Sequence, residues 1–410
     1  MEEWKEYKLG DIVSLVIDYR GKTPLKLGGS WSESGYRALS AKNIKTGKIV
    51  NEESIRFIDE DLYKKWMKDE VQRGDILITS EAPFGQIFYW DSDEKIVLSQ
   101  RLFCIRTKTD VFSKFLFYYM TTHQFQNELD GRATGTTVVG LRQPELMKCT
   151  IRLPSYDSQI KISNILSSID EKIENNRKIN ENLEAQAQAL FKSWFVDFEP
   201  FRDQPFVDSE LGMIPKGWRV GKLGDICVTN KRTYGANFQS QILYLDTGSV
   251  TNNIIEELKL LNPKIDKIPS RARRAVTEGD IVYSSVRPNQ RHFAFMYNPQ
   301  SNLVASTGFV VITANWSCYR FYIYQYLIQE KIINNLHAIA EQSVSTYPSI
   351  NATDITSLNI IIPPDDVIMR FAELCNSYFA VIHNNQNESR DLAKLRDTLL
   401  PKLMSGEIKV

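Results

Sequence analysis

The sequence predicts an α+β chain in which two similar mixed α/β domains are separated by two long antiparallel helices of the coiled-coil type. Three observations predict this fold class: 410 residues exceed one ordinary core, the sequence repeats with a period near 209 residues, and each repeat ends in a helical pattern nearly free of Gly and Pro. The predicted pseudo-twofold repeat divides the chain into domain 1 at residues 1–155, a central helix at 156–200, domain 2 at 207–362 and a C-terminal helix at 363–410.

The internal repeat is visible in short matching motifs. Trp4-x4-LGDI lies against Trp218-x4-LGDI, and Val71-x2-GDI lies against Val276-x2-GDI. The segments ATGTTVVGL and QSVSTYPSI share little identity, but their residue character and spacing agree at an offset of 209. A chain that repeats a unit of this length is expected to build the same domain twice.

Each domain is predicted to combine short strands with one aromatic helix. Runs such as GDILITS and GDIVYSS are rich in strand formers and bounded by turn residues. The Asp of LGDI and GDI is expected to cap local backbone amides where a turn enters a strand. Aromatic helical stretches at Val111–Thr122 and Cys318–Gln329 are interpreted as helices buried against a sheet, each followed by a last strand, CTIRLP or LNIIIP.

Both long helices carry a seam with the same register. Apolar residues recur at alternating steps of four and three, a mean period of 3.5 residues that is typical of coiled coils. The middle of the seam is polar, with Asn176 and Asn180 in the first helix and Asn385 and Ser389 in the second. In an antiparallel pair these polar centres meet and their amides bond across the interface. The alternative is that each helix packs on its own domain and the amides are solvated.

Composition argues against several classes of protein. The 50 basic and 50 acidic residues give no net charge, hence no global electrostatic signal for nucleic acid. No apolar run approaches the roughly 20 residues of a membrane span, and the N-terminus lacks a signal-peptide pattern, so a cytoplasmic location is expected. The five cysteines and four histidines have no disulfide or metal-site spacing.

No catalytic motif is recognisable, so the chain is expected to be non-catalytic. An amino-methyltransferase needs Asn or Asp before ProPro-aromatic, whereas Pro363 and Pro364 precede Asp365. The spacing Gly135-x4-Gly140 begins like a phosphate loop but lacks its Lys and Ser or Thr. Clustered carboxylates with a Lys, as a nuclease requires, are not evident either.

Five segments carry a resemblance to a known family: YKLGDI, YRGKTP, NILSSIDEKIENNRKINENLEAQAQALFKSWFVDFEPF, IPKGWRVGKLGDI, and NNQNESRDLAKLRDTLLPKLMSGEI. Over its whole length the chain resembles the specificity subunit of a type I restriction-modification system. The resemblance implies two target-recognition domains, each reading half of a split site in double-stranded DNA. It also implies a helical spacer that docks two modification methyltransferase subunits and, in the full complex, two restriction subunits. No cofactor is implied for this chain, and S-adenosylmethionine, ATP and Mg are implied for the partner subunits.

The predicted geometry agrees with that implication. Two domains related by a twofold through antiparallel helices would present matching surfaces to two segments of one duplex, with half-sites about one helical turn, roughly 34 Å, apart. A helix of this length spans about 60 Å at roughly 1.5 Å per residue and can therefore act as a ruler.

Candidate DNA contacts are basic, hydroxyl and amide side chains on predicted loops, because such groups bond to phosphates and base edges. In domain 1 they are Arg20, Lys22, Thr23, Lys42, Asn43, Ser80, Arg101, Arg132, Thr134, Thr136 and Thr137. In domain 2 they are Lys231, Arg232, Tyr234, the cluster Arg271, Arg273 and Arg274, then Ser285, Arg287, Asn289, Arg291, Ser343, Ser345, Thr346 and Tyr347.

One loop in domain 2 stands out among these candidates. SSVRPNQR contains a Pro that stiffens a loop presenting two Arg and two amide side chains. The equivalent loop of domain 1, ITSEAPFGQ, carries Glu81 and no Arg, so contact with DNA through Ser80 and Gln86 and a purely structural role both stay open.

The segment FKSWFVDFEPF is too aromatic for a solvated linker. Trp194, Phe195 and Phe198 are candidate anchors for docking methyltransferase subunits. The alternative is that they pack inside the chain against the neighbouring domain, and both can hold.

Other functions remain as alternatives. The chain could be a self-contained nuclease or methyltransferase, a structural tether whose paired domains bind polypeptides, or the specificity subunit of a system that only methylates. The sequence does not identify the bases that are read.

Overall fold

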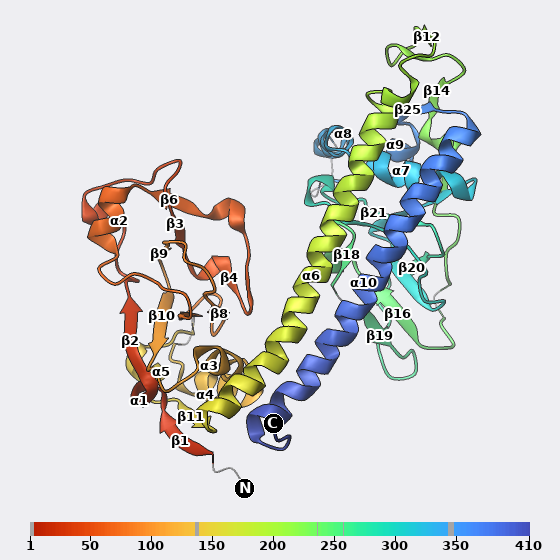
Figure 1. Cartoon of the computed structure of the whole chain (residues 1–410). Coiled ribbons are helices and arrows are strands. Elements are labelled where there is room, and N and C mark those ends of the chain that lie inside the picture. The colour runs from red at the N-terminus through yellow and green to blue at the C-terminus, as the bar shows by residue number, and fades with distance from the viewer. Residues whose placement is uncertain (1–3, 136–138, 236, 257, 343–347) are drawn as a thin grey trace. The chain divides into compact units, whose positions relative to one another are not determined.

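The computed structural model describes residues 4–135, 139–235, 237–256, 258–342 and 348–410. They divide into two compact units: Met1–Glu174 with Ser389–Val410, and Asn175–Glu388. The two long helices, α6 (Tyr156–Phe195) and α10 (Asp365–Ser405), each contribute one part to each unit (Figure 1).

The first unit is built on a four-stranded antiparallel sheet of order β2-β10-β7-β8. A smaller sheet has the order β6-β3-β9, in which β3 and β9 are parallel, and β1 pairs with β11 and β4 with β5. The strands are β1 (Lys5–Lys8), β2 (Val13–Asp18), β3 (Tyr36–Leu39), β4 (Ile44–Lys45), β5 (Lys48–Ile49), β6 (Arg56–Ile58), β7 (Ile76–Thr79), β8 (Ile87–Tyr89), β9 (Val97–Leu98), β10 (Leu102–Thr107) and β11 (Thr150–Leu153). The helices are α1 (Leu9–Ile12), α2 (Glu60–Trp66), α3 (Ser113–Met120), α4 (His123–Arg132) and α5 (Gln143–Met147).

The second unit repeats this plan. Its antiparallel sheet has the order β15-β24-β21-β22, a second sheet has the order β19-β16-β23-β20 with β16 and β23 parallel, and β14 pairs with β25. The strands are β12 (Phe206–Val207), β13 (Ile214–Pro215), β14 (Arg219–Lys222), β15 (Cys227–Thr229), β16 (Ile242–Leu245), β17 (Val250–Thr251), β18 (Ile254–Ile255), β19 (Lys259–Leu261), β20 (Ala272–Ala275), β21 (Ile281–Ser284), β22 (Phe293–Phe295), β23 (Leu303–Ser306), β24 (Phe309–Ala314) and β25 (Asn359–Ile362). The helices are α7 (Arg320–Leu327), α8 (Glu330–Glu341) and α9 (Ala352–Thr356).

The predicted fold class is confirmed, because both units are mixed α/β and their central four-stranded sheets share one strand order. The predicted role of the repeated Asp residues is confirmed as well. Asp75 accepts a hydrogen bond from the Gln72 amide at 2.8 Å just before β7, and Asp280 accepts one from the Thr277 amide at 2.7 Å just before β21. Each carboxylate therefore closes the turn that starts a central strand.

The aromatic helices lie in the interior of their units, as predicted. Phe115 of α3 is fully buried in a cluster with Ile78 and Phe103 of the sheet. Phe321 of α7 is equally buried and stacks on Phe295 of β22, with ring centroids 4.8 Å apart. These rings stabilise the core by removing large apolar surfaces from water and are not available to stack on bases.

The two long helices run antiparallel within the second unit. Phe371, near the start of α10, packs on Phe195, near the end of α6, at 4.9 Å between ring centroids. Asn385 donates to the Asn180 side chain at 2.9 Å, and Asn176 donates to Glu388 at 2.8 Å. The predicted pairing of the polar centres is therefore confirmed in this unit, and the alternative of solvated amides is wrong there.

The helix segments of the first unit are also antiparallel. Arg396 of α10 donates to Asp170 of α6 at 2.8 Å, and the same carboxylate accepts from the hydroxyl of Tyr118 on α3 at 2.7 Å. Leu403 lies in the same buried cluster as Ile162 and Leu166. The last residues of the chain thus complete the core of the unit that contains its first residues.

Two further sequence expectations concern cysteines and membranes. All five cysteines are free, and all but the half-buried Cys318 are buried. Among the described residues, no helix combines the length and the apolar character that crossing a bilayer requires.

A carboxylate of α6 is held inside the second unit. Glu184 accepts hydrogen bonds from Asn253 and from the Tyr324 hydroxyl, and Asn253 in turn receives a bond from Gln386 of α10 at 3.0 Å. Burial raises the pKa of the Glu184 carboxyl to about 7, and its two hydrogen bonds offset part of that rise. The folded protein therefore retains a proton at a pH at which the unfolded chain has released it.

This raised pKa predicts a pH-dependent stability. Between about pH 4.5 and 7 the folded state binds more protons than the unfolded state, so the free energy of unfolding falls as pH rises through that window. Glu184→Gln keeps the hydrogen-bonding shape and should flatten this dependence, with a gain at pH 8 of at most about 3 kcal/mol. Denaturant unfolding at pH 5 and pH 8 measures both effects, and an equal pH dependence in the two proteins would contradict the prediction.

Candidate nucleic-acid interface

Both units contain the same surface corner, built from three chain segments at one end of the central sheet. In the first unit the segments are the end of β7 with the loop after it, the start of β10, and the chain after α4. The Ser80 amide donates to the Arg101 carbonyl at 2.8 Å, and the Leu141 amide donates to the Ser80 carbonyl at 2.9 Å. Two backbone bonds therefore tie the three segments together at Ser80.

The second unit makes the same two bonds. The Ser285 amide donates to the Gly308 carbonyl at 2.8 Å, and the Ile350 amide donates to the Ser285 carbonyl at 2.8 Å. Ser285 follows β21 as Ser80 follows β7, and Gly308 precedes β24 as Arg101 precedes β10. The position that carries Arg101 in the first unit is therefore occupied by a glycine in the second.

The corner of the first unit is a hollow of about 380 Å³. It collects four residues predicted from the sequence, namely Arg20, Thr23, Ser80 and Arg101, and adds Lys26 and Gln100, which the sequence reasoning missed. Lys26 follows the YRGKTP motif by two residues, and Gln100 adjoins Arg101. Their proximity to predicted residues was the available signal, but neither belongs to a recognisable motif.

The two arginines of this hollow have different surroundings. Arg20 donates to both oxygens of Asp18 at 2.8 Å, lies 4.0 Å from the centre of the Phe103 ring, and reaches the Leu141 carbonyl at 3.4 Å. Arg101 is exposed and pairs with Glu81 through its Nε at 2.9 Å. Arg20 is thus part of the framework of the corner, whereas the outer end of Arg101 faces solvent.

Some residues of the first unit that were predicted to contact DNA are buried in its interior. Asn43 is fully buried, and its amide bonds to the Asn51 carbonyl at 3.1 Å and to Ser54 at 3.0 Å. Asn43 is therefore corrected from a DNA contact to a structural residue. Ser80 has only 2% of its surface exposed and acts through its backbone.

Other predicted basic residues of the first unit are tied to neighbours or lie elsewhere. Lys22 lies over the Tyr19 ring and donates to the Trp66 carbonyl, and burial lowers the pKa of its ammonium group. Arg132 pairs with Glu128 at 2.9 Å in the last turn of α4. Lys42 is exposed, and it does not line the hollow.

The predicted SSVRPNQR loop follows β21 directly. Arg287 and Asn289 are exposed, and the Arg287 amide donates to the Pro348 carbonyl at 3.1 Å. Arg291 forms an ion pair with Glu330 of α8. Ser285 is half-buried and donates to the Gly308 carbonyl at 2.9 Å. The loop is therefore anchored to two neighbouring segments, with Arg287 and Asn289 outermost.

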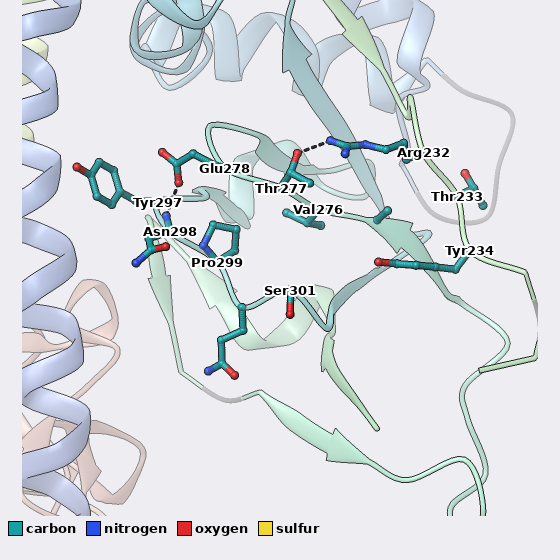
Figure 2. A pocket seen from close by; sticks show the side chains of 12 residues that line it. Arg232, Thr233, Tyr234, Val276, Thr277, Glu278, Tyr297, Asn298, Pro299 and Ser301 are labelled. Carbon is teal, nitrogen blue, oxygen red and sulfur yellow. Dashed lines mark hydrogen bonds between the residues drawn. The ribbon is translucent and has the colours of Figure 1, made fainter. Parts of the chain in front are cut away.

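Figure 2 shows the residues that line a second hollow, of about 580 Å³. Val276 to Glu278 of this lining precede the start of β21, at the opposite end of the strand from Ser285. The hollow is also lined by Arg232 and Tyr234, and Arg232 donates to Thr277. The wall also carries Glu278, which accepts from the Asn298 amide. Arg232 and Tyr234 are thus separated along the strand from the corner at Ser285.

The remaining predicted residues of the second unit have mixed surroundings. Lys231 is exposed, as is Arg271. Arg273 donates to the Gly235 carbonyl at 3.1 Å, and burial lowers the pKa of Arg274, which lies beside it on β20. Thr136, Thr137, Ser343, Ser345, Thr346 and Tyr347 lie outside the described residues.

The proposed docking anchors pack inside the second unit. Phe195 is 3% exposed and contacts the rings of Tyr322, Phe371 and Trp218. Trp194 lies against Phe371, and Phe198 packs on Trp218 at 5.5 Å between ring centroids. The interpretation of Phe195 as a docking anchor is corrected to a core residue, because its ring has no free face for a partner.

This packing predicts a large loss of stability when Phe195 is truncated. Phe195→Ala should lower the free energy of unfolding by about 3–5 kcal/mol, the range for deleting a buried aromatic ring. Val196→Ala is the matched control, since Val196 is 47% exposed and its truncation should be nearly neutral. Chemical denaturation of the full chain measures both, and an unchanged unfolding free energy for Phe195→Ala would return this ring to the docking surface.

Comparisons with known proteins agree with the internal repeat. The family model described as "Type I restriction modification DNA specificity domain" matches residues 1–185 and 215–388. The chain is 30% identical to the type I restriction enzyme MjaIX specificity subunit of Methanocaldococcus jannaschii, over 99% of this chain and 89% of the relative. It is 24% identical to the HindI specificity subunit of Haemophilus influenzae, over the full length of both.

A solved structure supports the fold. The type I restriction-modification S subunit from M. genitalium aligns with a TM-score of 0.59, covering 98% of this chain and 96% of that one at 15% sequence identity. This likeness concerns the fold alone, while the family match covers most of the chain. The chain therefore belongs to the type I restriction-modification DNA specificity family.

Proposed function

We propose that this chain is the non-catalytic DNA-recognition subunit of a type I restriction-modification complex. Each unit reads one half of a split site in double-stranded DNA, and the long helices fix the spacing of the two halves. The observation that carries the proposal is the corner built twice on one scaffold, with identical backbone bonds at Ser80 and Ser285 and different side chains around them. A shared scaffold with variable edges suits two domains that perform the same task on different sequences.

The corners have the chemistry that DNA recognition requires. Arg20, Lys26 and Arg101 place three cationic groups around one hollow, where Asp18 pairs with Arg20 and Glu81 pairs with Arg101. Cationic groups attract the phosphate backbone, and guanidinium and amide groups also distinguish base edges in the major groove. Arg101, which among the described residues is paired only through Nε, and the exposed Lys26 support a nucleic-acid partner at this hollow, although the chain as a whole has no net charge.

The outer faces of the helices support docking of modification methyltransferase subunits. In the second unit Leu374 and Val381 of α10 are exposed seven residues apart, and Ile179 of α6 is 45% exposed. In the first unit Ile165 and Leu395 are exposed. These five residues share one heptad position, since Ile165 and Leu374 differ by the repeat offset of 209. A repeated apolar position on the outside of a coiled coil fits a helical partner.

The remaining partners and cofactors follow from the proposed complex. Two methyltransferase subunits would supply S-adenosylmethionine chemistry, and two restriction subunits would use ATP and Mg. A system that only methylates is the second candidate, because the same corners and outer faces serve it equally. A polypeptide tether lacks a comparable observation in its favour.

Domain exchange tests the division of labour. Cells that carry the full chain with its methyltransferase should show methylated adenines in one split motif, and cells without the chain should lose that motif. Replacing residues 207–362 by the corresponding domain of a relative should change one half of the motif and leave the other half and the spacer unchanged. The measurement is genome-wide methylation mapping. A change in both halves, or the absence of any split motif with the intact chain, would contradict the proposal.

A matched insertion tests the ruler. One heptad added to α6 between Ile173 and Leu183, with one added to α10 between Ile382 and Leu392, preserves the pairing of the seam and lengthens the helices by about 10 Å. The spacer of the motif should grow by about three base pairs, while both half-sites stay the same.

Insertion into α6 alone is the control for this experiment. It shifts the paired amides out of register, so this variant should lose stability and methylation together. A stable, active double insertion with an unchanged spacer would rule out the ruler.

A further inference from the structure

We propose that Arg101 and Arg271 are equivalent base-reading arginines, each recognising a guanine in the half-site of its own unit. The proposal rests on the proposed function and assigns a base type to two named side chains. They occupy matching corners, although they come from non-equivalent positions in the repeat.

The backbone of Arg101 is held in an uncommon conformation. Its φ is +64°, in the left-handed region that costs energy for a residue with a side chain. The Ser80 amide donates to the Arg101 carbonyl at 2.8 Å, and the Ala41 amide donates to the carbonyl of the preceding Gln100 at 3.1 Å. These bonds fix the direction in which the side chain leaves the backbone just before β10.

Within the described residues, the side chain of Arg101 is held through Nε alone. Glu81 forms an ion pair with Nε at 2.9 Å, and the arginine side chain remains 48% exposed. Arg20, in the same hollow, instead has its guanidinium bound to Asp18 and stacked on Phe103. Glu81 therefore orients a guanidinium whose two terminal nitrogens have no partner among the described residues and remain for an external ligand.

In the second unit the position equivalent to Arg101 is Gly308, which has no side chain, and a guanidinium group reaches this corner from Arg271 instead. A Cβ added at Gly308 would lie 3.0 Å from a terminal nitrogen of Arg271 and 2.8 Å from the Thr247 methyl group. Arg271 is exposed, and its carbonyl accepts from the Thr307 amide at 2.8 Å. Arg271 thus occupies the space in which a side chain at residue 308 would begin.

The two units thus place a guanidinium group at the same corner from different positions in the chain. This indicates that the guanidinium group matters for function and that the residue position supplying it does not. An arginine on an exposed, anchored backbone can donate two parallel hydrogen bonds to O6 and N7 of guanine, the commonest base-specific contact of proteins in the major groove. A lysine does not reproduce that planar, two-pronged geometry. A phosphate contact, in contrast, requires positive charge but little directional precision.

The experiment uses the full chain assembled with its methyltransferase, together with Arg101→Ala, Arg101→Lys and Arg271→Ala. Methylation mapping and binding to a set of single-base variants of the motif give the discrimination at each position. Arg101→Ala should lower the discrimination at one guanine of one half-site by about 10- to 100-fold. Arg271→Ala should do the same at one guanine of the other half-site, so each variant controls for the other.

Arg101→Lys separates base reading from phosphate binding. Base reading predicts that the lysine variant loses discrimination at the same guanine while its binding to unrelated DNA stays close to that of the intact chain. If Arg101 contacts phosphate, Arg101→Ala weakens binding to all sequences equally and reduces its salt dependence, while lysine restores it. That second pattern would overturn the proposal.

Two further variants complete the test. Glu81→Gln keeps the shape of the side chain and should relax the same guanine position as Arg101→Ala. Arg73→Ala removes another exposed arginine, paired with Asp91 and Asp93 ahead of β7, and should leave the motif unchanged.

The outcomes distinguish this proposal from the proposed function. A half-site without guanine in the intact motif, relaxation of the same half-site by Arg101→Ala and Arg271→Ala, or an unchanged motif in both variants would each overturn the assignment of the arginines. The proposed function would survive each of these results, because it fails only when the intact chain directs no split motif.

Discussion

The register of α6 against α10 depends on polar contacts in an otherwise apolar seam. In the second unit, Asn180 meets Asn385 and Asn176 meets Glu388 across the two helices. A slip by one heptad would place these amides opposite hydrocarbon, where an unpaired polar group costs more than its hydrogen bond contributes. In the first unit the pair of Asp170 and Arg396 has the corresponding effect. Polar groups thus select one alignment, and the apolar seam positions stabilise it.

That alignment explains how the sequence is distributed between the units. Residues 389–410 join the first unit because α10 runs antiparallel to α6, and Leu403 enters the cluster that contains Ile162. Residues 175–195 join the second unit for the same reason, with Phe191 and Phe195 in its core. A cut at the predicted domain boundaries would therefore remove buried residues from both units. The predicted boundaries at residues 155 and 362 describe the repeat in the sequence, whereas the cores also use parts of both helices.

The duplicated framework could be predicted because its long helices have a periodic sequence pattern and its central strands begin at a repeated turn motif. The heptad spacing predicted both helices, the polar centres of the two seams favoured an antiparallel pair, and the repeated GDI motif located the entry to the central strands β7 and β21. The interface was harder to predict, because a loop arginine looks the same in sequence whether it is exposed or fastened to its neighbours. The surroundings of Arg20 and Arg101 differ in the folded chain, because Asp18 and Phe103 contact Arg20 whereas Glu81 contacts Arg101. Asn43 belonged to a promising basic segment, yet its amide completes hydrogen bonds inside the unit. Phe195 was ambiguous for a related reason, since an aromatic helix end suits a partner's surface as well as the chain's own core.

The glycine at residue 308 affects how relatives of this protein can be compared. Aligning the two halves by sequence pairs Arg101 with Gly308, and an arginine then looks lost, although Arg271 fills that space from the turn just before β20. A guanidinium can therefore persist at a surface while the residue that provides it moves along the chain. Grafting one recognition surface onto another chain requires the whole stretch from 271 to 308, because single-residue exchange would place two arginine side chains in one volume. An alignment scored column by column would therefore miss the arginine at this corner. Comparing where the guanidinium groups lie in the folded structures of relatives would detect it.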